Sequence, residues 1–188
     1  MVNWKTLVFL ILFPVTLIAQ QNVMINSYRF SGVTWPGCTN LVGNGDVESG
    51  AISPWWRYSD ASADLTTTTS NPYAGTYCLQ FHINTTGTSN VQVSQNGFAI
   101  TNGTTYKVSF YGKASASRSF YFAIIQNGPS YSNLGFEQTI NLTTSWQLFE
   151  YTFQANASES DVRWYMGIDA NGITGDDFYF DNLLICAQ

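Results

Sequence analysis

Three tyrosines in predicted strands have the residue type and the spacing to hold a sugar. The alternation of apolar and polar residues puts Tyr111, Tyr121 and Tyr165 on the outward side of their strands. A pyranose ring has one apolar C–H face and a hydroxyl edge, so flat aromatic rings and planar polar groups bind it well. This outward face favours carbohydrate binding, although outward Tyr is also common in strands because of β-propensity alone.

Catalytic constellations are hard to assemble from this sequence. His82 is the only histidine and lies inside a predicted strand, so a Ser-His-Asp or Cys-His arrangement would depend on it alone. The sequence contains no G-x-S-x-G or H-E-x-x-H motif and no phosphate-cradling Gly-rich loop. Two carboxylates would suffice for a glycosidase, but nothing in the spacing of the acidic residues selects a pair. A hydrolase or lyase is therefore the less favoured class.

The overall composition is that of an extracellular β protein. Charged residues make up 10% of the 188 residues and aromatic residues 16%, and Thr, Ser, Asn and Gly fill most positions between them. The net charge is -5 with only seven Lys and Arg, which leaves no basic footprint for nucleic acid or for an anionic membrane. We therefore expect neither partner.

Short strand-like runs, each bounded by Gly, Asn or Pro, must position these side chains. The predicted strands are 39–48, 64–69, 76–84, 90–100, 104–114, 118–126, 136–141, 146–154, 161–169 and 177–186. Ten strands at this spacing indicate an all-β protein, with a two-sheet β-sandwich of the jelly-roll type as the expected architecture. The residues predicted to face the core are Leu79, Phe81, Ile83, Tyr106, Val108, Phe110, Gly112, Phe120, Phe122, Ile124, Val162, Trp164 and Met166.

The chain divides into an export segment, an extension and one domain. Residues 1–19 read as a signal peptide, because Lys5 precedes an apolar run that ends at Ala19. A retained N-terminal anchor is the alternative. Residues 20–37 form an N-terminal extension, and 38–188 form the β-sandwich domain. We therefore expect a secreted protein.

The positions of the three cysteines suggest how the ends of the domain are joined. Cys38 precedes the first predicted strand and Cys186 ends the last, so a disulfide between them would staple the two ends together. Cys78 would then be a free thiol within a strand. A pair that includes Cys78 is the alternative, because sequence alone does not fix connectivity.

Five motifs follow one another in the order found in a known family. They are NLVGNGDVESGAISPWW at 40–56, YAGTYCLQF at 73–81, NGTTYKVSFYGKAS at 102–115, TTSWQLFEYTFQA at 143–155 and DDFYFDNLLI at 176–185. In this order the chain resembles the carbohydrate-binding modules of families 4, 9 and 22, from Asn40 to Ile185. The resemblance implies a jelly roll that binds polysaccharide without catalysis.

The resemblance also implies a structural calcium ion where the first and last strands of the domain meet. The matching positions are Glu48 and Asp181 by side chain, with backbone oxygens from Asp46 and from the turn between Ala74 and Tyr77. Calcium prefers six to eight oxygen ligands, and carboxylates from distant parts of a chain turn metal binding into a clamp on the fold. The alternative is that Glu48 and Asp181 are solvated acids at strand ends.

The family's sugar site carries over less completely than its metal site. Some relatives have a stacking Trp on the strand where this chain has Val91, Gln92, Val93 and Ser94. Other aromatic rings must then take over the stacking, and one of the two tryptophans in the 40–56 motif is expected in the core. Tyr165 matches a polar position of the relatives' groove. The predicted carbohydrate-binding residues are Tyr111, Tyr121, Tyr131, Tyr165, Gln92, Gln126, Arg163 and Trp55, and all depend on strand parity, which one bulge reverses.

The sequence therefore predicts a secreted, calcium-stabilised module that holds a polysaccharide of the β-glucan or xylan class in a groove on one sheet. Its expected partner is a polysaccharide or oligosaccharide, and three arrangements stay open: the module acts alone, it cooperates with a separate glycoside hydrolase, or it is a piece of a larger gene product. An extracellular adhesion sandwich that recognises protein is the alternative, since it would share the fold and the export signal.

Overall fold

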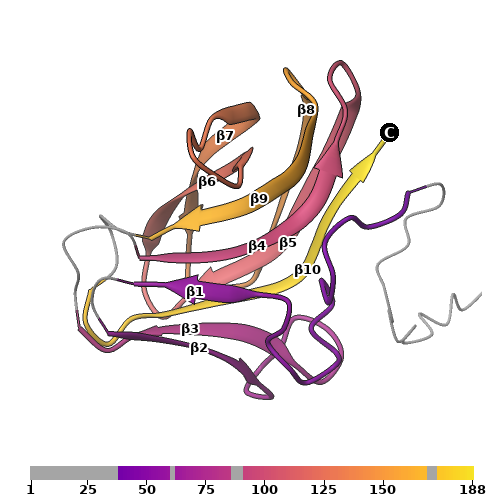
Figure 1. Cartoon of the computed structure of the whole chain (residues 1–188). Helices are drawn as coiled ribbons and strands as arrows, with labels where there is room; N and C mark the ends of the chain where they lie inside the picture. Colours follow the sequence, from indigo (N-terminus) through magenta and orange to yellow (C-terminus); the bar gives the residue numbers. More distant parts are fainter. Residues whose placement is uncertain (1–37, 60–61, 86–90, 169–172) are drawn as a thin grey trace, which may run out of the picture.

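A computed structural model of the chain describes residues 38–59, 62–85, 91–168 and 173–188 (Figure 1). Within these residues the protein forms ten strands and no helix. The strands are β1 Trp56–Tyr58, β2 Ala63–Thr68, β3 Cys78–Ile83, β4 Gln92–Ile100, β5 Thr105–Ala114, β6 Arg118–Gln126, β7 Asn133–Leu142, β8 Gln147–Gln154, β9 Glu159–Gly167 and β10 Asp177–Ala187.

The strands form two antiparallel five-stranded sheets. One sheet has the order β1-β4-β9-β6-β7 and is called the β9 sheet below. The other has the order β2-β3-β10-β5-β8 and is called the β10 sheet. Figure 1 shows β1, β4 and β9 in one layer and β2, β3 and β10 in the other. The all-β, two-sheet jelly-roll sandwich predicted from the sequence is confirmed.

The core lies between the sheets and is rich in aromatic rings. Phe110 on β5 is fully buried, and its ring lies 5.3 Å from that of Phe122 and 6.2 Å from those of Trp164 and Phe180. Burying a side chain of this size contributes about 1.5 to 3 kcal/mol each, and edge-to-face ring pairs add about 0.5 to 1.5 kcal/mol. The inward residues predicted from the alternation are buried as expected.

The prediction that 39–48 forms the first strand is wrong. Apart from a single bridge at Cys38, the chain from 39 to 50 consists of turns and bends. The Asn40 side chain holds the segment against β10 by accepting from the Ile185 backbone N–H and donating to the Leu183 carbonyl. Val47 has φ of +61°, outside the region of regular extended strand. The motif is therefore a loop bonded to β10 at separate points.

Two further strand boundaries differ from the prediction. β1, directly after Trp55, was missed because a strand of three residues is too short to show an alternation pattern. It pairs with β4 through Trp56 and Ser94. β7 begins at Asn133, three residues before its predicted start, because a register shift between Ile124 and Ile125 of β6 lengthens the pairing.

The ends of the domain are joined by a disulfide. Cys38 and Cys186 are bonded, with their Cα atoms 5.7 Å apart and 148 positions between them in sequence. Cys78 is free and buried. Closing a loop of this length contributes on the order of 4 to 5 kcal/mol in the chain-entropy model. Of the two predicted pairings, the first is the one present.

The predicted signal peptide and N-terminal extension, 1–19 and 20–37, lie outside the described residues. Among the residues that are described, no helix has the length and apolar character needed to cross a bilayer.

Candidate functional site

The outer face of the β9 sheet brings most of the predicted sugar-binding residues together. Strand pairing sets Ser94 opposite both Trp56 and Tyr165, and Asn96 opposite Arg163. In the adjacent row Gln92 and Gly167 lie in line with Tyr121. The Arg163 face is the name used below for Trp56, Gln92, Asn96, Tyr121, Tyr131, Arg163 and Tyr165.

The centre of this face is a cation between two aromatic rings. The Arg163 guanidinium carbon lies 5.0 Å from the ring centre of Trp56 and 5.0 Å from that of Tyr131. The Asn127 carboxamide oxygen accepts from both Nε and Nη2 of Arg163. Each cation–π contact is worth about 0.5 to 1 kcal/mol when exposed and more when partly desolvated. The three flat groups are therefore fixed relative to one another before any ligand arrives.

A hydrogen-bonded chain anchors this stack to the sheet. Asn127 donates to Asp161 at 2.7 Å, and Asn96 donates to the other oxygen of the same carboxylate at 3.2 Å. The Trp56 indole N–H donates to Asn96 at 3.0 Å. These amide donors hold the pKa of Asp161 below its usual value, with Asn127 the larger influence. The chain places an ionised carboxylate near Arg163 and so balances its charge.

Tyr165 lies over a glycine, which makes room for its ring. A Cβ atom on Gly167 would come within 2.7 Å of the Tyr165 hydroxyl oxygen and 2.8 Å of the ring. The Tyr121 ring stands edge-on to it at 6.1 Å, and the Tyr121 hydroxyl donates to Glu137 at 2.5 Å. Burial and then Glu137 raise the pKa of Tyr121 to about 12, so this hydroxyl stays protonated in ordinary buffers.

Both predicted glutamines have other partners in the structure. Gln92 points outward as expected but is only 7% exposed, and its side-chain oxygen accepts from Ser94. Gln126 is opposite the core residue Val162, so it has inward parity at the end of β6 and does not belong to the Arg163 face. Its side-chain oxygen accepts from Ser130. The expectation for Gln126 fails because β6 alternates from Phe120 through Ile124 to this position.

Trp55 and Tyr111 are not where the prediction put them. Trp55 is only 2% exposed and packs edge-on against Trp164 at 5.8 Å, so it is the core member of the tryptophan pair. Trp56 takes the outward position instead. Tyr111 does point outward, but from β5, which belongs to the β10 sheet. Alternation gives the side of each strand but not the sheet to which the strand belongs.

The remaining residues of the face could be found only in part from the sequence. Asn96 follows from the same alternation that places Gln92 and Ser94 outward. Tyr131, predicted from its type alone, sits in the loop after β6 with φ of +49°, a conformation that non-glycine residues rarely adopt. Such local strain collects at functional positions. Asn127 gave no sequence signal, because its role depends on the fold of that loop.

The predicted calcium ligands form a cluster around the turn that precedes β3. The Asp181 carboxylate, which is fully buried, accepts from the backbone N–H groups of Tyr73, Ala74 and Asn182. The Glu48 carboxylate accepts from the N–H groups of Thr76 and Tyr77, at 2.9 to 3.0 Å. This bonding pulls the turn toward two acids that lie far away in the sequence.

The charge of this cluster suits a cation. The pKa of Asp181 is raised to about 7: burial raises it most, the three backbone donors lower it, and the Glu48 charge adds to the rise. Among the described residues neither acid forms an ion pair with Lys, Arg or His. The nearby Asp46 is 7% exposed. No three acidic, His or Cys side chains within the described ranges are grouped as a metal site, so backbone carbonyls would have to complete the shell. Carboxylate oxygens are of the type that calcium takes, but the side-chain ligands are few and both carboxylates already accept from backbone N–H groups.

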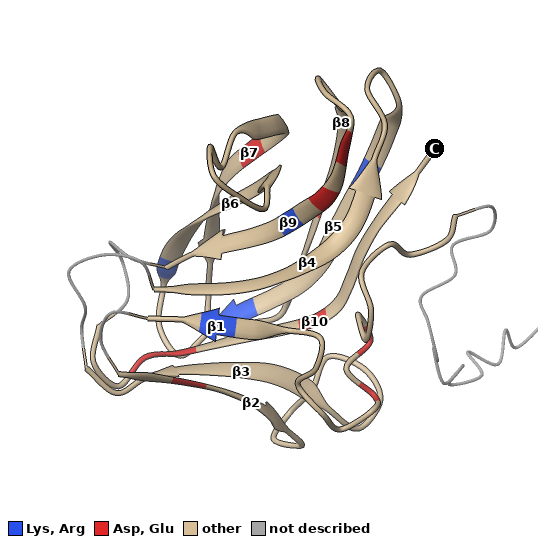
Figure 2. Cartoon of the chain, in the orientation of Figure 1, with Lys and Arg blue, Asp and Glu red and all other residues tan. Residues whose placement is uncertain are grey.

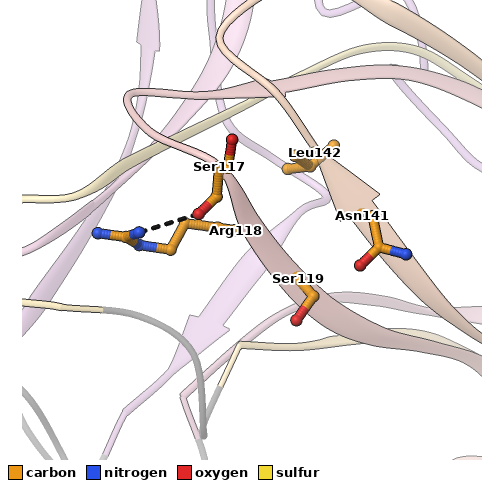
Figure 3. Close-up of a pocket in the computed structure, with 5 residues that line it drawn as sticks. All are labelled: Ser117, Arg118, Ser119, Asn141 and Leu142. Atoms are coloured by element: carbon orange, nitrogen blue, oxygen red, sulfur yellow. Dashed lines mark hydrogen bonds between the residues drawn. The ribbon is translucent and has the colours of Figure 1, made fainter.

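Two surface hollows are lined by residues that are not members of the Arg163 face. One, of about 340 Å³, is lined by Ser117, Arg118, Ser119, Asn141 and Leu142 where β6 begins and β7 ends (Figure 3). Figure 3 shows the Arg118 side chain turned toward the Ser117 carbonyl, and the guanidinium also pairs with Asp176 at 2.6 Å. This arginine is engaged within the protein. The candidate site is therefore the open face itself.

Comparison with known proteins identifies the family. The model of a carbohydrate-binding domain family that includes modules of the type 4 and 9 matches residues 39–171, and the chain belongs to this family. No match was found among curated proteins.

Similar solved structures agree on the fold. A CBM4 module has a TM-score of 0.60 and 23% identity, covering 78% of this chain and 99% of its own. The N-terminal cellulose-binding domain of a β-1,4-glucanase from Cellulomonas fimi has a TM-score of 0.56 and 21% identity, covering 71% of this chain and 88% of its own. A CBM22 xylan-binding domain from Paenibacillus barcinonensis has a TM-score of 0.55 and 14% identity, covering 76% of this chain and 91% of its own. At these identities the likeness establishes the β-sandwich.

Proposed function

We propose that the domain binds a neutral polysaccharide on the Arg163 face and breaks no bond in it. The observation that carries this proposal is the fixed stack of Trp56, Arg163 and Tyr131 beside the outward ring of Tyr165. Aromatic faces match the C–H side of pyranose rings, and guanidinium and amide groups match their hydroxyls. The stack lies across neighbouring strands, as contact with several successive sugars requires.

The charge balance favours an uncharged polymer. Asn127 bonds both Arg163 and Asp161, so the positive and negative groups of the face lie on either side of one amide. Figure 2 shows that Lys, Arg, Asp and Glu are sparse over both sheets. A β-glucan or a xylan backbone fits such a surface. Two of the similar domains are named for binding cellulose and xylan, which supports the same class here.

The described acid–base groups support binding over catalysis. His82 does pair with Asp177, at 2.8 Å, but both lie on the β10 sheet, away from the Arg163 face. Cys78, on the same strand as His82, is buried, and its pKa is raised to about 12 mainly by that burial. An activated thiol would show the opposite shift. The domain would then serve a separate glycoside hydrolase by holding it or its substrate in place.

A structural calcium ion is the second part of the proposal. Glu48 and Asp181 would hold it by their carboxylates, with oxygens from Asp46 and from the turn between Ala74 and Tyr77. When bound, calcium would supply the positive charge that the buried Asp181 lacks. The fully buried carboxylate beside a second acid supports this proposal.

Secretion is the expected context for such a module. The Cys38–Cys186 disulfide supports it, because disulfides form and persist in oxidising compartments.

Affinity electrophoresis tests the binding proposal. The domain is run through gels that contain xylan, barley β-glucan, laminarin or hydroxyethyl cellulose, beside Tyr165→Ala. Ile173→Ala, which removes an exposed apolar side chain outside the face, is the control. We expect one polymer to retard the parent and the control but not Tyr165→Ala. No retardation in any gel would contradict polysaccharide binding and favour recognition of protein.

A further inference from the structure

The outer face of the β10 sheet carries a second aromatic platform, centred on a tyrosine that precedes β3. The Tyr73 ring lies almost parallel to that of Tyr111, with centres 3.4 Å apart and 13° between the planes. Trp146 stands edge-on to Tyr73 at 6.2 Å. Tyr73 nevertheless remains 43% exposed. One face of its ring is thus supported from below while the side chain stays accessible to a ligand.

Planar and charged groups surround this platform. Lys113 places its ammonium 4.9 Å from the Trp146 ring centre and 4.8 Å from that of Tyr179. Further along the same face, Gln80 donates to Asp177 at 2.8 Å. The Tyr73 face is the name used below for Tyr73, Gln80, His82, Tyr111, Lys113, Trp146, Asp177 and Tyr179.

The platform is held in place from the far end of the chain. The backbone N–H of Tyr73 donates to Asp181 at 3.0 Å, across 108 positions of sequence. The indole N–H of Trp146 donates to the Asn71 carbonyl at 3.1 Å, which ties the start of β8 to the same loop. Burial and then Tyr73 raise the pKa of Tyr111 to about 12, so its hydroxyl remains a neutral donor. The rings are therefore ordered before a ligand binds, which lowers the entropy cost of binding.

Charged groups on this face and beside it already have partners within the protein. Asp177 pairs with His82 at 2.8 Å, Glu150 pairs with Lys107 at 2.7 Å, and Lys113 lies between two aromatic rings. A charged partner, such as an acidic or basic protein surface, would have to break these contacts. A neutral ligand rich in hydroxyl groups needs only to stack on Tyr73 and to share the outer lone pairs and N–H groups.

We propose that the Tyr73 face is a second carbohydrate-binding site, and that one domain therefore bridges two polysaccharide chains. The two sheets pack core to core about 10 Å apart, so their outer faces point in opposite directions. A single straight glycan segment cannot contact both. The second site stands independently of the Arg163 face, whereas bridging rests on the proposed function of that face.

The test follows each face separately by NMR. The ¹⁵N-labelled domain is titrated with xylohexaose, cellohexaose and laminarihexaose in turn. With the hexasaccharide that binds, we expect amide shifts in two groups, one around Arg163 and one around Tyr73 and Tyr111. Tyr73→Ala should lower the affinity measured from the second group about tenfold, the scale of one lost stacking contact. Tyr73→Phe should keep it, and both variants should leave the first group unchanged.

Bridging is measured by light scattering with the soluble polymer. The parent should raise the scattering most at an intermediate ratio of protein to polymer, and Tyr73→Ala should bind without that maximum. Shifts around Arg163 alone would overturn the second site and leave the proposed function standing. Shifts around Tyr73 alone would support the second site and contradict the proposed function of the Arg163 face. Thermal unfolding of both variants checks that the fold is retained. If Tyr73→Ala unfolds, the presence or absence of amide shifts around Tyr73 and Tyr111 in the parent decides whether the second site exists.

Discussion

The Arg163 face and the Tyr73 face present aromatic rings in two physically different ways. On the first, strand register and a short hydrogen-bonded chain through Asn96 and Asp161 position Trp56 and Tyr165, and the loop after β6 adds Tyr131. On the second, the exposed ring belongs to a loop, and the Asp181 carboxylate fixes that loop through backbone N–H groups. The Arg163 face is therefore set mainly by strand pairing within the β9 sheet. The other depends on a contact between distant parts of the chain.

This difference predicts which perturbations should separate the faces. A change in the acidic cluster should loosen the Tyr73 face and leave the Arg163 face intact, because no member of that cluster belongs to the β9 sheet. A change at Arg163 or beneath Tyr165 should do the opposite.

The largest effect is expected for Asp181→Ala. The substitution leaves three backbone N–H groups without their acceptor, which costs about 3 kcal/mol in the free energy of unfolding. For a domain of this size that lowers Tm by roughly 6 to 12 °C. Differential scanning calorimetry measures it, with the exposed Asp64→Ala on β2 as the matched control. Loss of hexasaccharide shifts around Arg163 in the folded variant would show that the faces are not independent.

Calcium should act on the same cluster with a slightly smaller effect. At a free concentration one hundred times its Kd, a ligand that binds only the folded state adds about 2.7 kcal/mol, or roughly 5 to 11 °C in Tm. Thermal unfolding with calcium, with magnesium and after EDTA treatment measures this. Magnesium should add little, because it is reluctant to shed water. Equal Tm values with calcium and with EDTA would mean that the backbone N–H groups alone hold Glu48 and Asp181.

Arg163→Ala should weaken binding at the Arg163 face by about 2 kcal/mol, or roughly thirtyfold, because two cation–π contacts are lost and Asn127 is released. Arg163→Lys should recover little, since an ammonium cannot stack as a flat group. Isothermal titration calorimetry with the binding hexasaccharide measures both. The control is Arg57→Ala, which removes an exposed arginine opposite Val93 on the same sheet. If both variants bound the hexasaccharide as tightly as the parent, Arg163 would not be part of the binding site.

The β-sandwich could be predicted from the sequence because alternation in long strands is a local property. The inward positions Phe110, Phe122 and Trp164 are buried as the pattern required. The same pattern could not tell that Tyr111 and Tyr121 lie on different sheets, because the order of strands in a sheet depends on contacts between distant segments. The residues predicted for one face therefore lie on two.

The loops gave the least information. The segment around Val47 resembles a strand in composition, but the Asn40 side chain makes bonds to β10 in place of a regular ladder, and the chain from 41 to 50 turns repeatedly. Asn127 and Asp161 were missed for a related reason. An Asn or Asp near a strand end is most often a turn residue, and only the folded loop brings this pair to Arg163.

The smallest predicted effect concerns Gly167. A methyl group there would meet the Tyr165 ring and hydroxyl within 2.7 to 2.9 Å, and the side chain can yield because it is flexible and points outward. Gly167→Ala should therefore change Tm little but move the ring from its place, with a loss of about 1 kcal/mol in affinity at the Arg163 face. Calorimetric titration and the NMR shifts of Tyr121 and Tyr73 read out the two faces together. An unchanged affinity would mean that Tyr165 binds sugar from another rotamer, whereas a loss at both faces would mean that the sheets transmit strain to each other.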